Sequence, residues 1–368
     1  MTISNAFLRY VYYILFCVPW ILSKTTCLFR MKRSTLSSKA SIRTQSHQVG
    51  HSTPRGRVDK SYLNITILWT KSTWCRLSML LSLFPLISSA SPSVDSYRSI
   101  ILDACCRMGS GMVDLVHAPT AGPAVIAFDT IAEYERYCLC VSGLVYEALA
   151  RIFSVSGRED TWTDSQMNSL ISLAVMLQKV DIICDFYEDV ERGHHFWPRE
   201  IWGRPEYGNF ANQSDLVKAA EQGQDGPLYA LSGMIVNSLE HSIEALESLA
   251  FVKTERVLHF YAIHLTKGVA TLEMSFMNRD VFTKHLNMPK GDIAQVRHGH
   301  LAFSSQLSWW FCFKLLMRSA SLEDISRVFH DNAKKILARA TPADPNFPRI
   351  TAACQKVGYC LWPGQLSF

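Results

Sequence analysis

The sequence predicts an all-α protein from about Leu77 onward. Apolar residues recur at helical spacing in nearly every segment of this region, whereas the strict alternation of a half-buried strand is scarce. The segments end at stretches that contain proline or glycine, which interrupt helices. Several segments are apolar almost all round, so we expect one large helical core rather than a thin bundle.

The first 75 residues differ in amino-acid composition from the rest of the chain. Residues 6–22 are mostly apolar and aromatic, at the lower limit of length for a spanning helix or a signal anchor. A basic run rich in Ser and Thr follows, with nine Lys or Arg and one acidic residue between positions 24 and 60. We therefore expect two regions: residues 1–75, disordered or translated from a wrongly assigned exon, and residues 76–368, the helical domain.

Proline and glycine residues mark where the expected helices of this domain end. Pro- and Gly-containing stretches at 119–123, 157–163, 203–205 and 223–227 separate the first four, and Thr163 or Asp164 can cap the helix that follows residue 163. The expected helices cover residues 95–116, 131–154, 165–191, 227–249, 255–277, 293–318 and 321–340.

Bulk composition limits the function. The 368 residues carry a net charge of +5, which indicates no nucleic-acid partner. The 11 cysteines show no CxxC or Cys/His metal spacing, so we interpret them as small core residues in a reducing compartment. The chain contains no GxGxxG after a strand, no P-loop and no GxSxG, so nothing in it indicates the common nucleotide-binding or serine-hydrolase sites.

Three aspartates four residues apart mark the helix expected at 165–191. Asp181, Asp185 and Asp189 share one helical face. Like charges at this spacing destabilise a bare helix by about a few tenths of a kcal/mol per pair, so the repeat needs a partner, and a hard divalent cation is one. A solvated acidic face is the alternative. The apolar residues around the carboxylates are more typical of a lined cavity.

Two other expected helices carry residues that are candidates for a role in chemistry. Tyr137, Val141 and Val145 follow one another at i, i+4 and i+8. They form either a core stripe with one tyrosine or an apolar wall with a phenol for proton handling or cation stabilisation. His264 and Lys267 are unusual in an otherwise apolar helix.

Five blocks of sequence together resemble one known family. They are RMGSGM at 107–112, YCLCVSGLV at 137–145, LQKVDIICDFYEDVERGHHFWPREIW at 177–202, FYAIHLTKGVATL at 260–272 and DPNFPRITAACQKV at 344–357. From about residue 80 to residue 363, the chain resembles squalene synthase (farnesyl-diphosphate farnesyltransferase), most closely its fungal members. The FWPREIW stretch beside an acidic helix is the most specific of these signals.

The resemblance implies an all-α isoprenoid-synthase fold over residues 76–368, with a deep central cavity. It implies a prenyltransferase that joins two farnesyl diphosphates head to head through presqualene diphosphate. Reduction by NADPH then gives squalene, in sterol or secondary isoprenoid biosynthesis. Mg²⁺ is the implied metal, and a monomer on the cytosolic face of the endoplasmic reticulum membrane is expected. The family's C-terminal membrane anchor has no counterpart up to Phe368, which leaves residues 6–22 as the alternative means of membrane association.

The resemblance also gives each site residue a role. Tyr137 is the expected catalytic phenol. The expected metal ligands are Asp181, Asp185, Glu188 and Asp189. The expected substrate contacts are Val141, Val145, Arg151, Gln178 and Phe260, and Lys290 is expected to contact NADPH.

The chain departs from the family pattern at several of these places. Residues 1–94 contain no counterpart of the family's first aspartate-rich motif, DTxEDD. Asp181 stands where the family has asparagine, Cys184 where it has arginine and Tyr146 where it has glycine; His264 replaces a proline. Three hypotheses therefore stay open: a squalene synthase-type enzyme, a catalytically impaired paralogue, and a related terpene-forming enzyme without the reductive step.

Overall fold

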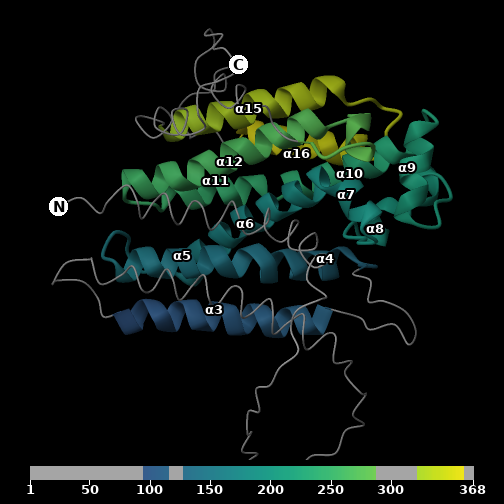
Figure 1. The fold of residues 1–368 in the computed structure, drawn as a ribbon. Helices are drawn as coiled ribbons and strands as arrows, with labels where there is room; N and C mark the ends of the chain where they lie inside the picture. The colour runs from purple at the N-terminus through teal and green to yellow at the C-terminus, as the bar shows by residue number, and fades with distance from the viewer. Residues whose placement is uncertain (1–93, 116–126, 287–320, 360–368) are drawn as a thin grey trace, which may run out of the picture. The chain divides into compact units, whose positions relative to one another are not determined.

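The structure, a computed structural model, describes residues 94–115, 127–286 and 321–359 (Figure 1). The chain divides into two units, Met1–Ser91 and Pro92–Phe368, and every described residue belongs to the second. The described residues form helices and turns, with an isolated β-bridge between Ala127 and His195. The prediction of an all-α protein is confirmed. The expected boundary after residue 75 and the expected helix at 293–318 lie outside the described residues.

The described helices follow one another from the end of the first unit to residue 359. Three of them are single turns of unusual pitch, η2 being π-helical and η3 and η4 being 3₁₀. In order they are α3 (Val94–Leu115), α4 (Ile131–Cys138), η2 (Leu139–Gly143), α5 (Leu144–Val155), α6 (Asp164–Cys184), α7 (Phe186–Glu191), α8 (Arg199–Trp202), η3 (Pro205–Tyr207), α9 (Gln213–Glu221), α10 (Gly226–Leu239), α11 (Ser242–Ala250), α12 (Glu255–Ser275), η4 (Arg279–Phe282), α15 (Leu322–Arg339) and α16 (Phe347–Tyr359).

Helix α6 is the centre of this unit. It packs against α4, η2 and α5, which lie below it in Figure 1, and against α10, α11 and α12, which lie above it. Leu170, Leu173 and Met176 of α6 are fully buried. On the outside, α3 packs on α5, and α15 packs on α12 and α16. The helix that carries the three aspartates is therefore covered by neighbours along most of its length.

Capping boxes define where four of the helices begin. In each, the N-cap side chain accepts a hydrogen bond from the third residue of the helix, whose own side chain accepts one from the N-cap backbone. Each such cap stabilises its helix by about 1 kcal/mol. The pairs are Thr130 and Glu133, Thr163 and Gln166, Asn212 and Asp215, and Ser321 and Asp324. Of the two caps predicted for α6, Thr163 is the residue that acts.

Three expected helices are interrupted. The stretch 131–154 contains the π turn η2, in which the backbone N–H of Leu144 donates to the carbonyl of Leu139. The stretch 165–191 divides at Asp185, whose φ of −87° and ψ of 0° end α6. The stretch 227–249 divides between α10 and α11. The helices α8, α9 and α16 are additional to the prediction.

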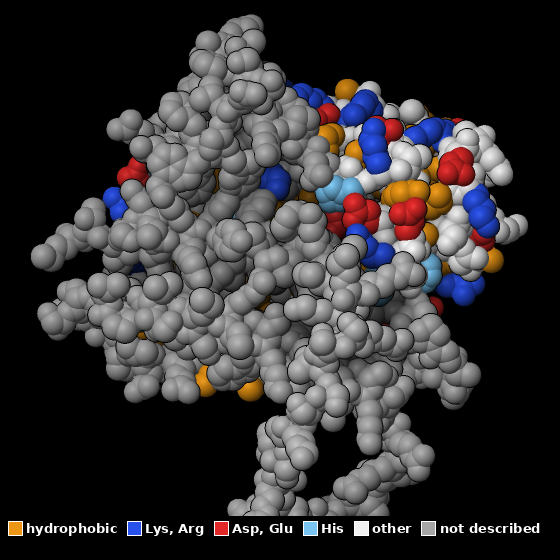
Figure 2. All heavy atoms as spheres, in the orientation of Figure 1, with side chains coloured by type: hydrophobic (Ala, Val, Ile, Leu, Met, Phe, Trp, Pro, Cys, Tyr) orange, Lys and Arg blue, Asp and Glu red, His pale blue; other side chains and the backbone are white. Residues whose placement is uncertain are grey.

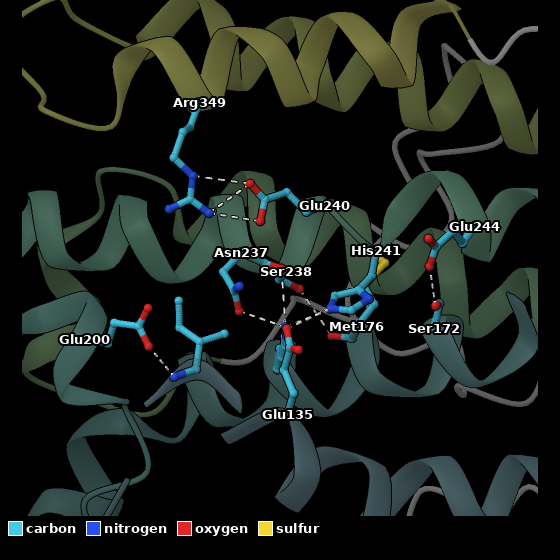
Figure 3. Close-up of polar contacts among 12 residues, drawn as sticks. Glu135, Ser172, Met176, Glu200, Asn237, Ser238, Glu240, His241, Glu244 and Arg349 are labelled. Atoms are coloured by element: carbon cyan, nitrogen blue, oxygen red, sulfur yellow. Dashed lines mark hydrogen bonds and ion pairs between the residues drawn. The ribbon is translucent and has the colours of Figure 1, made fainter. Parts of the chain in front are cut away.

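A fully buried lysine ties the layers together around α6. The Nζ atom of Lys179 lies 2.7 Å from Oε1 of Glu135, 2.8 Å from Oδ1 of Asn237 and 2.8 Å from Nε2 of His241. Figure 3 shows the side chains of Glu135, Asn237 and His241 converging from three elements. The Nε2 atom of His241 also lies 3.3 Å from Oε1 of Glu135, so these side chains and Lys179 form one polar cluster.

Two helical segments are long and apolar enough to cross a membrane by length and composition alone. They are Ile131–Val155, which spans α4, η2 and α5, and Asp164–Cys184, which is α6. More than half of each apolar window is buried inside the helical unit. The core therefore accounts for their apolar character.

Candidate active site

The acidic face of Asp181, Asp185 and Asp189 lies at the junction of α6 and α7. The backbone N–H of Asp185 donates to the carbonyl of Asp181 at 2.9 Å, and that of Asp189 donates to the carbonyl of Asp185 at 2.9 Å. Helical i to i+4 bonding thus continues across the break at Asp185. The three carboxylates keep one face, as their spacing predicted.

Burial and mutual repulsion make two of these carboxyl groups weak acids. Burial, and then the charge of Asp185, raises the pKa of Asp181 to about 7. Burial, and then the charge of Asp185, also raises the pKa of Asp189 to about 7. Because Asp185 contributes to both shifts, its carboxylate lies between the other two. The face holds negative charge that its surroundings only partly compensate, which is the condition a divalent cation relieves.

Three basic side chains act on this face, two of them through ion pairs. The Nδ1 atom of His285, just after η4, lies 2.6 Å from Oδ1 of Asp185. Arg192 holds Glu188 at 2.8 Å. Lys267 of α12 lowers the pKa of Asp181. In the space-filling view, acidic, basic and histidine side chains lie side by side over α7 (Figure 2).

Tyr137 lies at the Asp189 end of the face. It is buried at the end of α4, and its ring centroid lies 5.3 Å from that of Phe128 and 5.3 Å from that of Phe196. Burial is the main cause that raises the pKa of its phenol, and the charge of Asp189 raises it further. The hydroxyl therefore stays protonated at neutral pH, close to the acidic face and inside an aromatic cluster of Phe128, Tyr137 and Phe196.

The π turn η2 sets the direction of the two valines. Val141 is buried within η2, and Val145 is half-buried in the first turn of α5. A π turn has a wider helical repeat than an α-helix, so residues spaced by four stay closer to one line through it. Single π turns of this kind occur frequently at functional sites. Tyr137 and the valines thus remain candidates for one wall.

The remaining expected substrate contacts fall into two groups. Gln178 is buried on α6 one turn before Asp181, and Phe260 is buried on α12, where its ring lies 4.8 Å from that of His264. The ring centroid of Tyr146 lies 6.5 Å from that of His264, and burial and then the charge of Asp181 raise the pKa of its phenol. Phe260, His264 and Tyr146 therefore form one group of rings, whereas Gln178 lies on the helix of Asp181 itself.

Arg151 occupies a different place. It lies 3.0 Å from Asp103 of α3 and 2.7 Å from Glu147, and Arg107 of α3 contacts the same two acids. It follows Tyr137 by 14 positions, which is roughly 20 Å along helical chain. Its contacts join α3 to α5, so its role as a diphosphate contact stays a prediction. Lys290 lies outside the described residues.

Sequence reasoning missed several residues that the structure brings to the site. His285 follows a short 3₁₀ turn and has no motif around it. Phe128 lies before α4 with no motif of its own, whereas Phe196 belongs to the FWPREIW stretch, which gave the family signal but no role. Lys267 was noticed as unusual, and the charge of Asp181 raises its pKa against the larger effect of burial, which relates it to the acidic face.

The carboxylates of the acidic face fit Mg²⁺ only as part of a coordination shell that waters and substrate phosphates complete. Within residues 94–115, 127–286 and 321–359, no group of three His, Cys, Asp or Glu side chains is arranged to hold a metal ion. Mg²⁺, however, is usually bound by one or two carboxylates, with waters and substrate phosphates completing its shell. Asp185 and Asp189 fit that description. The larger set with Asp181 and Glu188 stays a prediction.

The fold and the site together define a protein of the all-α isoprenoid-synthase class, with a carboxylate face beside a buried phenol. The chain belongs to the squalene/phytoene synthase family, whose pattern matches residues 82–290. It is 36% identical over 266 residues to squalene synthase of Ganoderma lucidum, covering 71% of this chain and 53% of that protein. With squalene synthase of Mycosarcoma maydis it shares 32% over 273 residues, covering 71% and 44%.

A solved structure supports the same fold. The complex of TcSQS with the ligand BPH1237 superposes with a TM-score of 0.60 at 25% identity, covering 74% of this chain and 70% of that one. The chain spans about half the length of the curated relatives it matches.

Proposed function

We propose that this chain is a squalene synthase-type prenyltransferase that joins two farnesyl diphosphates head to head and, with NADPH, forms squalene. The observation that carries the proposal is the packing of Tyr137, at the end of α4, on Phe196, seven residues after Asp189 of α7, with ring centroids 5.3 Å apart. The charge of Asp189 also raises the pKa of the Tyr137 phenol. A buried phenol beside a carboxylate face suits chemistry in which a diphosphate leaves and an allylic cation forms. Family membership makes farnesyl diphosphate the first substrate to test.

The residues of the candidate site would have different roles in this reaction. Asp185 and Asp189 would hold Mg²⁺, which supplies positive charge to the leaving diphosphate when bound. The rings of Phe128, Tyr137 and Phe196 offer their faces to a carbocation, an attraction of about 0.5–2 kcal/mol per ring. The protonated hydroxyl of Tyr137 can hydrogen-bond an anionic oxygen or hand over a proton as charge develops. The buried rings exclude water, which would otherwise capture the cation.

A second candidate is an enzyme that stops before reduction. The observation in its favour is Cys184, which is buried beside Asp181 and Asp185. Burial raises the pKa of its thiol, so the residue is neutral and gives the site no positive charge. A site with less positive charge would ionise its second diphosphate more slowly.

The test is product analysis with the full chain. Labelled farnesyl diphosphate is incubated with Mg²⁺, with and without NADPH, and the products are separated. Squalene formed only with NADPH supports the proposal. Presqualene diphosphate, farnesol or a cyclic terpene in the presence of NADPH supports the second candidate. The absence of any product would leave a catalytically impaired paralogue.

Location and assembly follow from the same proposal. A sterol-pathway enzyme with an apolar substrate is expected at the cytosolic face of the endoplasmic reticulum membrane, and a monomer is expected. Cell fractionation of the full chain and its mass in solution test these two statements.

A further inference from the structure

A histidine from a distant part of the chain contacts one oxygen of the Asp185 carboxylate. The Nδ1 atom of His285 lies 2.6 Å from Oδ1 of Asp185, and the two side chains are 27% and 24% exposed. Asp185 ends α6 and precedes α7, and its side chain forms no cap hydrogen bond at the start of α7. The contact with His285, rather than a helix cap, therefore constrains the direction of this carboxylate.

A backbone hydrogen bond places His285 beside Asp185. The backbone N–H of Leu286, the residue after His285, donates to the carbonyl of Cys184, the residue before Asp185, at 3.3 Å. This bond joins the end of α6 to the segment that follows η4, one residue away from each partner of the contact. His285 and Asp185 are thus neighbours because their backbones are attached at this point, although 100 positions separate them.

Aromatic packing holds the same segment against α7. Phe282 of η4 is fully buried, and its ring centroid lies 5.3 Å from that of Phe186 and 6.0 Å from that of Trp197. The chain enters η4 through Met277, whose φ of +54° lies in the left-handed region that residues other than glycine seldom adopt. Such a backbone conformation persists where the surrounding structure holds it in place. Packing therefore fixes the position of His285 before its own side chain contributes.

A role in holding the fold together explains this contact less well. The packing of Phe282 and the backbone bond of Leu286 already attach the segment, and an ion pair as exposed as this one adds little to stability. A carboxylate that binds a cation, by contrast, needs a fixed direction. Replacing a side chain that contacts a metal-binding carboxylate from outside the coordination shell typically lowers metal affinity about 10- to 100-fold.

We propose that His285 is a positioning residue of the metal site, which holds Oδ1 of Asp185 and leaves Oδ2 of the same carboxylate to the cation. This rests on the proposed function, in which Asp185 and Asp189 bind Mg²⁺, and deepens it by naming the group that orients the first of these ligands. His285 acts through Asp185 and is not itself a ligand. Its replacement therefore changes the affinity for the cation without removing an atom from the coordination shell.

The test compares two substitutions of nearly equal size. In His285→Asn the amide nitrogen is separated from Cβ by the same number of bonds as Nδ1 of histidine, so the contact with Asp185 can be kept. In His285→Leu a methyl group takes that place. Because asparagine and leucine are both uncharged, the comparison isolates the polar contact. Thr283→Val is the matched control, since it removes a hydroxyl of the same segment that donates to the carbonyl of Asp280 at 3.3 Å.

Calorimetry with the full chain measures the dissociation constant of Mg²⁺ in the presence of saturating inorganic pyrophosphate, which supplies phosphate oxygens to the coordination shell. His285→Leu should raise this constant about tenfold, the lower end of the usual range, because the contact is partly exposed. His285→Asn should stay within about threefold of the wild type. Thr283→Val should bind as the wild type does, and circular dichroism confirms that each variant is folded.

Electron paramagnetic resonance of bound Mn²⁺ distinguishes a positioning residue from a ligand. Mn²⁺ takes the same kind of oxygen ligands as Mg²⁺ and serves as its spectroscopic substitute. In the wild-type chain with pyrophosphate, the spectrum should show no nitrogen bound directly to the metal. This readout needs no substitution, so it tests the role of His285 even if His285→Leu does not fold.

Four results would overturn the proposal. They are a wild-type chain that binds no Mg²⁺ with pyrophosphate, a folded His285→Leu variant that binds Mg²⁺ as tightly as the wild type, an equal loss of affinity in His285→Asn and His285→Leu, and a nitrogen bound directly to Mn²⁺. None of these readouts requires squalene. A chain that makes no squalene can still support the role of His285, and an active enzyme whose metal affinity ignores His285 refutes that role alone.

Discussion

The Nζ atom of Lys179 lies 2.7 Å from Oε1 of Glu135, and the lysine side chain is fully buried between α4, α6 and α10. Tyr137 follows Glu135 by two residues on α4, and Asp181 follows Lys179 by two residues on α6. The pair therefore joins the helix that carries the phenol to the helix that carries the carboxylates. Its geometry fixes the two parts of the candidate site relative to each other.

Replacing this lysine should destabilise the protein strongly. Lys179→Met leaves Glu135 without its cation and Asn237 without its donor, and breaking a buried pair on one side costs about 3–5 kcal/mol. Because the side chain of Glu135 is 39% exposed, we expect the lower end, about 3 kcal/mol. The free energy of unfolding in urea measures the change. Lys218→Met, which removes a 70% exposed lysine paired at 3.9 Å, should change it by less than about 0.5 kcal/mol. Equal effects of the two variants would contradict a central role for the buried pair.

Asp185 should be essential for turnover. Asp185→Asn keeps the size of the side chain but removes the charge that pairs with His285 and that a metal ion would need. We expect the rate of diphosphate release from farnesyl diphosphate to fall by at least about a hundredfold, the scale of losing one electrostatic contact in a transition state. The assay measures initial rates at saturating Mg²⁺. Asp280→Asn, which removes an exposed carboxylate on η4, should keep the wild-type rate. If Asp185→Asn turned over normally, the acidic face would not be a metal site.

The local sequence predicted the helices well where capping residues determine the start of a helix. Thr163 and Gln166 form the capping box at the start of α6, and both are visible as a Thr-x-x-Gln pattern. The π turn η2 could not be predicted, because a hydrogen bond of the i to i+5 type leaves no signature in LCVSG. The break at Asp185 had no signal either, since neither glycine nor proline is nearby.

The candidate site was predictable only along single helices. The spacing of Asp181, Asp185 and Asp189 gave the acidic face, because four residues make about one helical turn. The partners of that face come from elsewhere in the chain. His285 lies 100 positions after Asp185, so only tertiary packing relates them. The same holds for Lys267, which lies 86 positions after Asp181 and whose charge lowers the pKa of that carboxyl group.

The hydroxyl of Tyr137 should act in chemistry rather than in folding. Tyr137→Phe keeps the ring contacts with Phe128 and Phe196 and removes only the proton donor. We expect kcat to fall about 10²- to 10⁴-fold, the usual contribution of a positioned acid or base, while KM stays within a few-fold. Steady-state kinetics with farnesyl diphosphate measure both constants.

Tyr261→Phe is the matched control for that measurement. Tyr261 is also fully buried, and its hydroxyl has no hydrogen-bond partner in the part of the chain that the structure describes. Removing that hydroxyl should leave both kcat and the melting temperature near the wild type, because no hydrogen bond is lost. A Tyr137→Phe enzyme with wild-type kcat would show that the phenol of Tyr137 only fills space.

The stability of the protein should depend on pH through Asp189. Its pKa lies at about 7 in the folded protein, above the ordinary value of 3.8, because burial and the charge of Asp185 oppose ionisation. The folded state therefore binds this proton more tightly than the unfolded chain does. The resulting stabilisation is complete below pH 3.8 and is lost as the pH rises to about 7. Asp189→Asn carries no such proton, so it should gain stability relative to the wild type across this range.

The difference in free energy of unfolding between Asp189→Asn and the wild type isolates this effect. His264, whose pKa is lowered to about 4 mainly by burial, has the opposite dependence on pH, but it is present in both proteins and cancels. Between pH 5 and 8 the difference should shift in favour of the variant by about 1–2 kcal/mol. Saturating Mg²⁺ should reduce the shift. A cation bound at Asp189 offsets the repulsion between the carboxylates of Asp189 and Asp185, and so favours the ionised form of Asp189. A difference that stays constant with pH would mean that Asp189 is ionised without penalty, and the acidic face would then need no cation.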